Sequence, residues 1–310
     1  MEYSLLPGTT RRVSRIAFGC AAMGGYDYGP VDDSVSIAAV HRALDLGINC
    51  FDTADVYGFG HAERVLAGAL VGRRTEVVIA TKGGVRWDAS GRTTRTLDPS
   101  YLVQALESSL QRLETDYIDL YQLHWPVAGA VYDHIMETLE RCRTAGKLLA
   151  IGCSNMTRQE VQQLADHGLL SSEQYPFNLL DRSAEGSLKA ATAAGRLTLT
   201  YNSLAQGLLA GKHRLKEQFV GTDLRMRGGH FRRPDMARQV VGLERVGEVA
   251  RRVGRSSLQV ALRWALDQGY VDVAITGIKQ PRQADENAGA ADWQLSEWDR
   301  RFLSGDESPR

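Results

Sequence analysis

The 310-residue sequence alternates short apolar runs with amphipathic stretches, and this alternation constrains its fold more than any other feature. Apolar or β-branched runs followed by helical spacing are typical of β-strand, α-helix, β-strand units and a parallel sheet. Strands are predicted at residues 16–20, 48–52, 77–82, 117–124, 148–152, 173–175, 197–201 and 271–275. Helices are predicted at residues 33–46, 62–70, 98–113, 132–145, 158–166, 184–194, 240–253 and 257–266, with a last one from residue 281.

Eight such units favour a closed (β/α)₈ TIM barrel, an architecture that often reaches this length as one domain. Residues 2–14 have strand, turn and strand character, which predicts an N-terminal β-hairpin covering one end of the barrel. One extra helix is expected before strand eight. No repeat or linker divides the chain, so a single domain over residues 1–310 is expected. A doubly wound sheet is disfavoured because residues 19–25 and 58–60 lack G-x-G-x-x-G spacing.

Composition points to a small-molecule partner. Lys and Arg number 37, as do Asp and Glu, so a broad basic surface for nucleic acid is not expected. The four cysteines show no disulfide framework or metal-ligand spacing, which predicts buried free thiols in a reducing compartment. With no basic leader and no apolar stretch long enough to span a bilayer, a cytoplasmic protein without a membrane partner is expected. These features do not predict an oligomeric state.

Three consecutive strands, the second to the fourth, end in ionisable residues: Asp52, Lys82 and His124. In a barrel the carboxyl ends of the strands share one rim, where active sites lie, and the loop after strand two adds Tyr57 to it. Each residue alone has a structural explanation, as a loop cap, a lysine reaching water or a core histidine. Their coincidence on neighbouring strands favours a functional site.

Tyr57 gives this group of residues its chemistry. A free phenol titrates near pH 10 and is a poor acid near neutrality, but an adjacent ammonium ion favours the phenolate and lowers its pKa. Lys82 can supply that charge, Asp52 can hold Lys82, and His124 can donate a hydrogen bond to a substrate oxygen. The set forms a general acid for a carbonyl that receives hydride. No metal site is expected, because the other histidines lack ligand spacing.

These segments also carry a family resemblance. Residues 51–58 (FDTADVYG), 80–82 (ATK) and 116–124 (DYIDLYQLH) match motifs of the aldo-keto reductase superfamily, in that family's order and approximate spacing. The chain resembles this superfamily from end to end. It is most similar to a bacterial branch that includes inositol dehydrogenase-like and general-stress reductases.

The resemblance implies a catalytic tetrad of Asp52, Tyr57, Lys82 and His124, with Tyr57 as the acid and a nicotinamide across the barrel mouth. It implies contacts to the carboxamide, pyrophosphate and adenosine parts of the cofactor from Ser154, Asn155, Gln174, Tyr201, Ser203, Leu204, Gln206, Gly207, Lys212, Gly277, Lys279, Gln283, Glu286 and Asn287. By residue type alone, Ser154 and Asn155 also fit a helix N-cap, and the two roles are compatible.

The resemblance implies NADP(H) as the preferred cofactor, with NAD(H) possible. Lys279, with Arg282 at the start of the next helix, would meet the 2′-phosphate, although by composition alone both are solvated surface cations. Two departures from the family pattern weaken the expected binding of the adenosine end of the cofactor. Thr276 stands where the family commonly has proline, and Gln280 where relatives can carry a second basic residue.

The expected reaction is reversible hydride transfer between the cofactor and an aldehyde or ketone, or the corresponding alcohol. Four loop aromatics, Tyr26, Tyr28, Trp87 and Trp125, predict a substrate pocket, although loop aromatics also pack on their own scaffold. Two other functions stay open. Lys82 could be the Schiff-base nucleophile of an aldolase, or the chain could be a non-enzymatic, cofactor-sensing subunit resembling the potassium-channel β-subunits of this superfamily.

Overall fold

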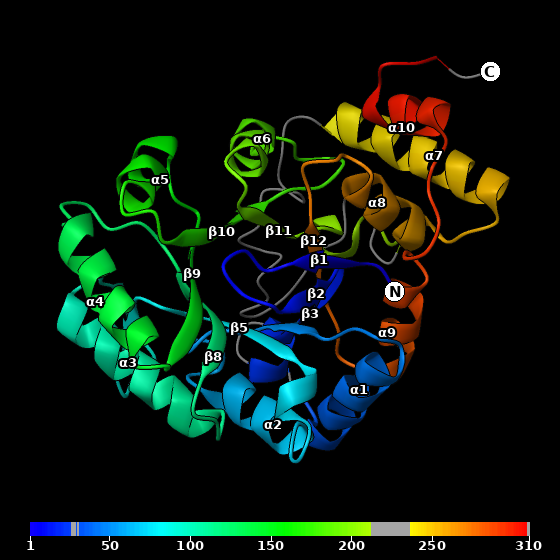
Figure 1. Cartoon of the computed structure of the whole chain (residues 1–310). Coiled ribbons are helices and arrows are strands. Elements are labelled where there is room, and N and C mark those ends of the chain that lie inside the picture. The colour runs from blue at the N-terminus through cyan, green and yellow to red at the C-terminus, as the bar shows by residue number, and fades with distance from the viewer. Residues whose placement is uncertain (26–28, 30, 212–235, 309–310) are drawn as a thin grey trace.

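The structure is a computed structural model, and the residues described below are 1–25, 29, 31–211 and 236–308. The barrel strands are β3 (Ile16–Gly19), β4 (Cys50–Asp52), β5 (Val78–Gly83), β8 (Ile118–Leu123), β9 (Leu148–Ser154), β10 (Leu170–Pro176), β11 (Leu197–Tyr201) and β12 (Val273–Gly277). They are parallel and close in the order β10-β11-β12-β3-β4-β5-β8-β9 (Figure 1). The closed barrel confirms the predicted fold class.

The helices surround this barrel on its outer face (Figure 1). They are α1 (Asp33–Asp45), α2 (His61–Ala69), α3 (Pro99–Arg112), α4 (Tyr132–Thr144), α5 (Arg158–Ala165), α6 (Glu185–Ala193), α7 (Met236–Val253), α8 (Ser257–Leu266), α9 (Pro281–Ala288) and α10 (Glu297–Ser304). Both α7 and α8 lie between β11 and β12, which confirms the extra helix expected before the eighth strand.

N-terminal capping residues explain where several helices begin. The Asp32 side chain accepts hydrogen bonds from backbone amides of α1, and Asp98 does the same for α3, whose first residue is Pro99. Thr157 and Ser256 open α5 and α8 with complete capping boxes. Such caps satisfy backbone donors that the helix itself leaves unpaired.

The predicted N-terminal hairpin is present as β1 (Tyr3–Leu5) and β2 (Arg12–Ser14), paired antiparallel. Leu6 and Val13 from this segment are buried with Ala17 and Cys50 in the hydrophobic cluster that fills the barrel interior. The hairpin therefore covers the amino-terminal end of the barrel, as expected.

Two elements depart from the sequence predictions. Between the predicted strand at residues 77–82 and the predicted helix at 98–113, where no element was predicted, the chain forms a second hairpin, β6 (Val85–Trp87) and β7 (Thr93–Arg95). All three residues of β7 are exposed, so no apolar alternation marks this strand in the sequence. The helix from Pro281 is not the last, because α10 follows it, capped by Ser296, whose side chain accepts from the Asp299 amide. At eight residues, α10 is short for a periodicity argument.

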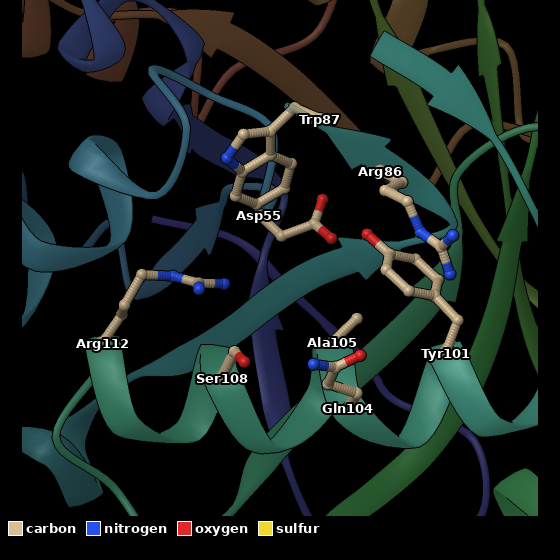
Figure 2. Close-up of a pocket in the computed structure, with 8 residues that line it drawn as sticks. All are labelled: Asp55, Arg86, Trp87, Tyr101, Gln104, Ala105, Ser108 and Arg112. Atoms are coloured by element: carbon tan, nitrogen blue, oxygen red, sulfur yellow. The ribbon is translucent and has the colours of Figure 1, made fainter. Parts of the chain in front are cut away.

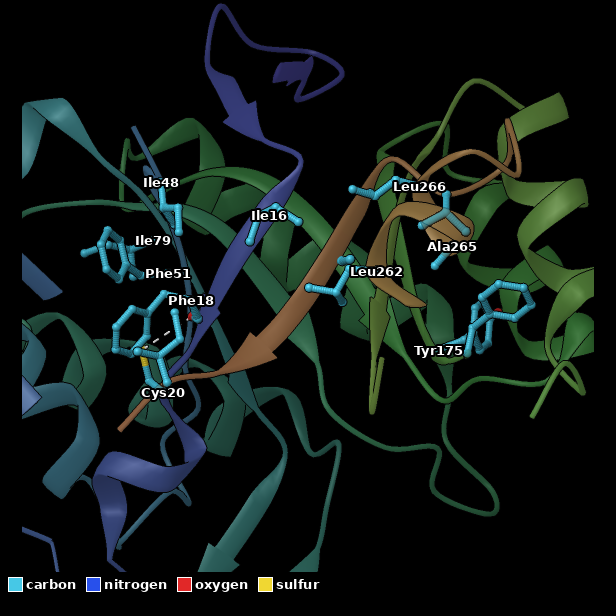
Figure 3. Packing of buried hydrophobic residues seen from close by; sticks show 14 of the residues in the cluster. Ile16, Phe18, Cys20, Ile48, Phe51, Ile79, Tyr175, Leu262, Ala265 and Leu266 are labelled. Carbon is cyan, nitrogen blue, oxygen red and sulfur yellow. Dashed lines mark hydrogen bonds between the residues drawn. The ribbon is translucent and has the colours of Figure 1, made fainter. Parts of the chain in front are cut away.

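A larger hydrophobic cluster packs the strands against the helices (Figure 3). Phe18 of β3 and Phe51 of β4 lie with ring centroids 5.5 Å apart within it, and Leu262 of α8 belongs to the same cluster. Alternate residues of the strands face the two clusters: Ile16 and Phe18 face the helices, whereas Ala17 faces the barrel interior.

A buried acid at the opposite end of the barrel from the predicted site has a structural role. Asp119, near the start of β8, accepts from Arg11 at 2.7 Å, from Arg74 at 2.7 Å and from the Ile79 amide at 2.9 Å. Its two oxygens are therefore fully engaged within the protein, which offsets the cost of burying the charge.

All four cysteines are buried free thiols, as predicted. Within residues 1–25, 29, 31–211 and 236–308, no group of three or more His, Cys, Asp or Glu side chains is arranged to hold a metal ion. Across these same residues, no helix has the length and apolar character that crossing a bilayer requires.

Candidate active site

The structure brings the four predicted catalytic residues together at one rim of the barrel. Lys82 of β5 is fully buried and donates from Nζ to Asp52 Oδ1 at 2.7 Å and to the Thr53 carbonyl at 2.9 Å. The Lys82 ammonium lies 5.2 Å from the centroid of the Tyr57 ring. The rings of Tyr57 and His124 meet edge to face at 5.9 Å. A phenol, an ammonium ion, a carboxylate and an imidazole thus share one site.

The backbone around Tyr57 depends on glycine. Gly58 has φ of 58°, and its neighbours Phe59 and Gly60 are also in the left-handed region, at 55° and 87°. A Cβ atom on Gly58 would lie 2.2 Å from the Gly24 carbonyl oxygen, and one on Gly24 would lie 2.6 Å from the Gly58 nitrogen. The loop after β3 therefore packs backbone to backbone on the loop that carries Tyr57.

His124 follows β8 directly and is held by several contacts. Its backbone amide donates to the Gly83 carbonyl, and its ring stacks on Trp125 at 5.7 Å. Burial, and then the charges of Lys82 and Arg95, hold the pKa of His124 well below its usual range. Its Nδ1 has no hydrogen-bond partner among the described residues. A neutral imidazole with one N–H is suited to donating a hydrogen bond to a substrate oxygen.

Gln174 connects the far side of the rim to this group. Its Nε2 donates to Asp52 Oδ2 at 2.8 Å, so both oxygens of that carboxylate are hydrogen-bonded. The Ser154 hydroxyl lies 3.4 Å from Gln174 Oε1 and accepts from Asn155 Nδ2 at 3.0 Å. The Tyr201 hydroxyl donates to Asn155 Oδ1 at 2.7 Å. Hydrogen bonds therefore run across the ends of the neighbouring strands β9, β10 and β11 and reach Lys82 through Asp52 of β4.

Asn155 adopts the left-handed conformation, with φ of 64°, and its Nδ2 also donates to the His124 carbonyl at 3.0 Å. Its side chain links the ends of β8, β9 and β11 by hydrogen bonds and does not cap a helix. The N-cap interpretation of Ser154 and Asn155 is therefore wrong, because Thr157 caps α5. The side chain of a cap must precede its helix directly, and two residues separate Asn155 from the helix start.

The loop after β11 contributes another set of polar groups. The Ser203 hydroxyl donates to the Ile275 carbonyl at 3.0 Å, which joins this loop to β12. Gln206 has φ of 56° and a backbone amide that donates to Asn202 Oδ1. Its buried side-chain Oε1 has no hydrogen-bond partner among the described residues. Leu204 and Gly207 flank this turn.

The segment after β12 forms a second cluster at the same rim. Gly277 ends the strand, with open space where a side chain would stand. The Lys279 amide donates to Gln283 Oε1 at 2.7 Å, closing the start of α9. Asn287 is buried and donates from Nδ2 to Thr276 Oγ1 at 2.8 Å. Glu286 contributes a backbone carbonyl that accepts from Gln259.

Thr276 thus has a structural role of its own. Its hydroxyl donates to the Ala17 carbonyl at 3.1 Å while accepting from Asn287. This ties β12 to β3 and α9 at the position where a proline was expected from the family resemblance.

Comparison with known proteins identifies the family of the chain. The model of the aldo/keto reductase family matches residues 15–301. The chain belongs to the aldo/keto reductase family. It is 35% identical to the aldo-keto reductase YhdN of Bacillus subtilis, over 98% of this chain and 93% of that protein. It is 31% identical to the NADH-specific methylglyoxal reductase of Escherichia coli, over 96% and 95%.

A solved structure shows the same architecture. The glycerol dehydrogenase of Gluconobacter oxydans superposes with a TM-score of 0.90 and 32% identity, covering 98% of this chain and 94% of that one. This family acts on small-molecule carbonyl compounds with nicotinamide cofactors, so the chain is an oxidoreductase of the aldo/keto reductase family.

The predicted aromatic pocket of this aldo/keto reductase is divided in the structure. Trp125 stacks on His124 and lies at the rim. Trp87 lies in the β6–β7 hairpin, 6.0 Å from Phe59 between ring centroids, and lines a different pocket (Figure 2). Tyr26 and Tyr28 lie outside the described residues, as does the predicted cofactor contact Lys212.

Sequence reasoning missed two features of the site. It assigned Gln174 to the cofactor alone, although the residue also holds Asp52. It gave no role to the close approach of Gly24 and Gly58, for which the only sequence signal was a pair of glycine-containing loops.

Proposed function

We propose that this protein catalyses reversible hydride transfer between a nicotinamide cofactor and a small carbonyl compound, with Tyr57 as general acid in reduction and base in oxidation. One observation carries the proposal: a buried ammonium ion lies 5.2 Å from the Tyr57 ring and is held there by Asp52 at 2.7 Å. A cation beside a phenol favours the phenolate, which makes the phenol a stronger acid.

The other rim residues have complementary roles in this proposal. His124, neutral because of its lowered pKa, orients the substrate oxygen towards the Tyr57 hydroxyl. Asp52 fixes the position of Lys82, and Gln174 fixes that of Asp52. During reduction, Tyr57 gives its proton to the carbonyl oxygen, and Lys82 stabilises the phenolate that remains.

The rim residues fit a nicotinamide dinucleotide. The Gln206 side-chain oxygen, which has no hydrogen-bond partner among the described residues, and the open space at Gly277 suit a large polar ligand lying across the strand ends. Ser154 and Asn155 would hold the carboxamide, Ser203, Leu204, Gln206 and Gly207 the pyrophosphate, and Gly277, Lys279, Gln283, Glu286 and Asn287 the adenosine end. A nicotinamide bound there supplies or accepts the hydride.

We further propose that both cofactors are used and that NADP(H) is preferred. Lys279 and Arg282 are exposed at the start of α9, where backbone amides and side chains together favour an anion such as a 2′-phosphate. Because the Escherichia coli relative is named as an NADH-specific enzyme, the affinities for NADPH and NADH have to be measured directly.

The Schiff-base alternative receives less support from the geometry. Lys82 is buried, with 0% relative exposure, and donates one hydrogen bond to Asp52 and one to the Thr53 carbonyl. A nucleophilic lysine must be neutral and reach the carbonyl carbon. Borohydride with a carbonyl substrate would modify Lys82 covalently only if this alternative held.

An activity screen tests the proposal. Methylglyoxal with NADPH or NADH, and glycerol with NADP⁺ or NAD⁺, are the first assays, since two relatives are named for these compounds. Multiple turnovers with any aldehyde, ketone or alcohol are expected. Cofactor binding without turnover on a broad panel would support the cofactor-sensing alternative instead.

A further inference from the structure

A pocket separate from the proposed active site lies between the β6–β7 hairpin and α3 (Figure 2). Its volume is about 290 Å³, and its lining includes Asp55, Arg86, Tyr101 and Arg112. None of the four proposed catalytic residues lines it. In Figure 2 the Asp55 carboxylate lies between Trp87 on one side and α3 on the other, with guanidinium groups to its left and right.

The Asp55 carboxyl group is buried among the described residues that line this pocket. The residue is 1% exposed, and neither carboxyl oxygen has a hydrogen-bond partner among the described residues. Burial, and then the charge of Glu63, hold the pKa of Asp55 well above its usual range. A buried carboxyl group without partners is costly, which calls for an explanation beyond packing.

The donors around Asp55 are already engaged elsewhere. Arg112 donates from Nε to Glu63 Oε2 at 2.6 Å, and the Tyr101 hydroxyl donates to the Val85 carbonyl at 2.9 Å. Lys82 is held by Asp52. Among the described residues that line the pocket, the Asp55 carboxyl group is therefore a polar group that a ligand can satisfy.

Arg86 supplies a charge at the mouth of the same pocket. It is exposed and lies 4.7 Å above the Tyr101 ring. Among the described residues it makes no ion pair within 4 Å. A guanidinium group that a ring holds in place and that forms no close ion pair among the described residues is well suited to bind a carboxylate or phosphate.

We propose that this pocket binds a small organic acid that also carries a hydroxyl or amino group. The acid group would pair with Arg86, and the hydroxyl or amino group would donate to Asp55. The volume of about 290 Å³ lies at the small end of ligand pockets, which limits the occupant to a compact molecule.

Binding measurements with defined probes test this assignment. Glycerate, serine and glycerol 3-phosphate each carry both groups, whereas propionate lacks the donor and glycerol lacks the acid. We expect saturable binding of at least one of the three complete probes by ligand-observed NMR or calorimetry. Propionate and glycerol should bind at least about tenfold more weakly.

Three variants connect the binding to the pocket. Arg86→Ala should weaken binding of a complete probe about tenfold. Arg92→Ala, at an exposed arginine of the same hairpin that pairs with Asp88, is the control and should leave that binding unchanged. Asp55→Asn should weaken serine binding about tenfold, because the ammonium group of serine favours the ionised form of Asp55 and an amide cannot ionise. Since the Asp55 carboxyl group makes no hydrogen bond among the described residues, this variant should retain the fold, which thermal unfolding can check.

Two results would overturn the proposal. One is the absence of saturable binding for all three complete probes. The other is binding that is unchanged in Arg86→Ala but lost in Trp125→Ala, because the probe would then occupy the active-site rim. Neither readout depends on turnover, so the outcome is independent of the function proposed above.

Discussion

Gln174 donates a hydrogen bond to Asp52 Oδ2 at 2.8 Å, while Lys82 holds the other oxygen of the same carboxylate at 2.7 Å. The residue expected to contact the nicotinamide carboxamide therefore also positions the acid that holds Lys82, the lysine of the proposed catalytic group. Because the two side chains come from β10 and β4, which are not neighbours in the barrel, this contact spans its interior.

The first prediction follows from this contact. Gln174→Ala leaves Asp52 Oδ2 buried without its donor, which should lower the free energy of unfolding by about 1–3 kcal/mol and reduce kcat. Denaturant unfolding and steady-state kinetics measure the two effects. Gln162→Ala, at an exposed glutamine of α5, is the matched control and should change neither. Unchanged stability in Gln174→Ala would show that the hydrogen bond contributes nothing to the fold.

The close approach of two loops gives a second prediction. Gly58→Ala places a Cβ atom 2.2 Å from the Gly24 carbonyl oxygen and must displace the loop that carries Tyr57. A displacement of about 1 Å at a catalytic group costs on the order of 10²-fold in rate. We expect that loss in kcat with a folded protein. Gly186→Ala, with nothing within 4 Å of the new atom, should retain full activity, and equal activity in the two variants would refute the packing argument.

The lowered pKa of His124 predicts a pH dependence of stability. An unfolded histidine titrates near pH 6.5, whereas burial, Lys82 and Arg95 lower the pKa in the folded state. The unfolded chain therefore gains a proton first as the pH falls, so stability is fully present above about pH 6.5 and declines below it. Unfolding at a series of pH values should show that His124→Gln loses less stability on acidification than wild type.

The control for this measurement is His134→Gln, at an exposed histidine of α4. It should follow the wild-type curve. An identical decline in all three proteins would mean that the His124 ring does not contribute to the acid sensitivity.

The cofactor proposal gives a fourth prediction. Lys279→Ala should weaken NADPH binding by about 1–3 kcal/mol, the range for a charged hydrogen bond, and leave NADH binding nearly unchanged. The difference in NADPH affinity between wild type and Lys279→Ala should shrink as salt is added, because exposed charges are screened. Fluorescence titrations with both cofactors measure this. Equal losses for the two, or a wild type that binds NADH more tightly, would contradict the proposed contact with the 2′-phosphate.

The barrel and the core of its site could be predicted from the sequence because both follow from local patterns. Strand-terminal Asp52, Lys82 and His124 share a rim in any parallel barrel. The partner of Gln174 could not be predicted, because it depends on the side-chain geometry of two strands across the barrel. The cap of α5 was misassigned to Ser154 and Asn155, since residue type alone does not show which residue precedes the first helical turn.

The pocket between the β6–β7 hairpin and α3 could not be predicted from the sequence either. Asp55 lies within the FDTADVYG segment and resembles any loop acid in the sequence. The placement of α3 and of the β6–β7 hairpin, whose strand β7 lacks apolar alternation, shows that this carboxyl group is buried without a hydrogen-bond partner among the described residues.

The central claim is that Tyr57 transfers the proton, and single-turnover kinetics of Tyr57→Phe test it most directly. The variant keeps the ring beside Lys82 and removes only the hydroxyl, so reduction should slow by about 10²- to 10⁴-fold. Cofactor affinity, measured by fluorescence, should stay close to that of wild type. Tyr117→Phe, at the opposite end of the barrel, should react at the wild-type rate. A Tyr57→Phe variant that reduces its substrate as fast as wild type would contradict the account.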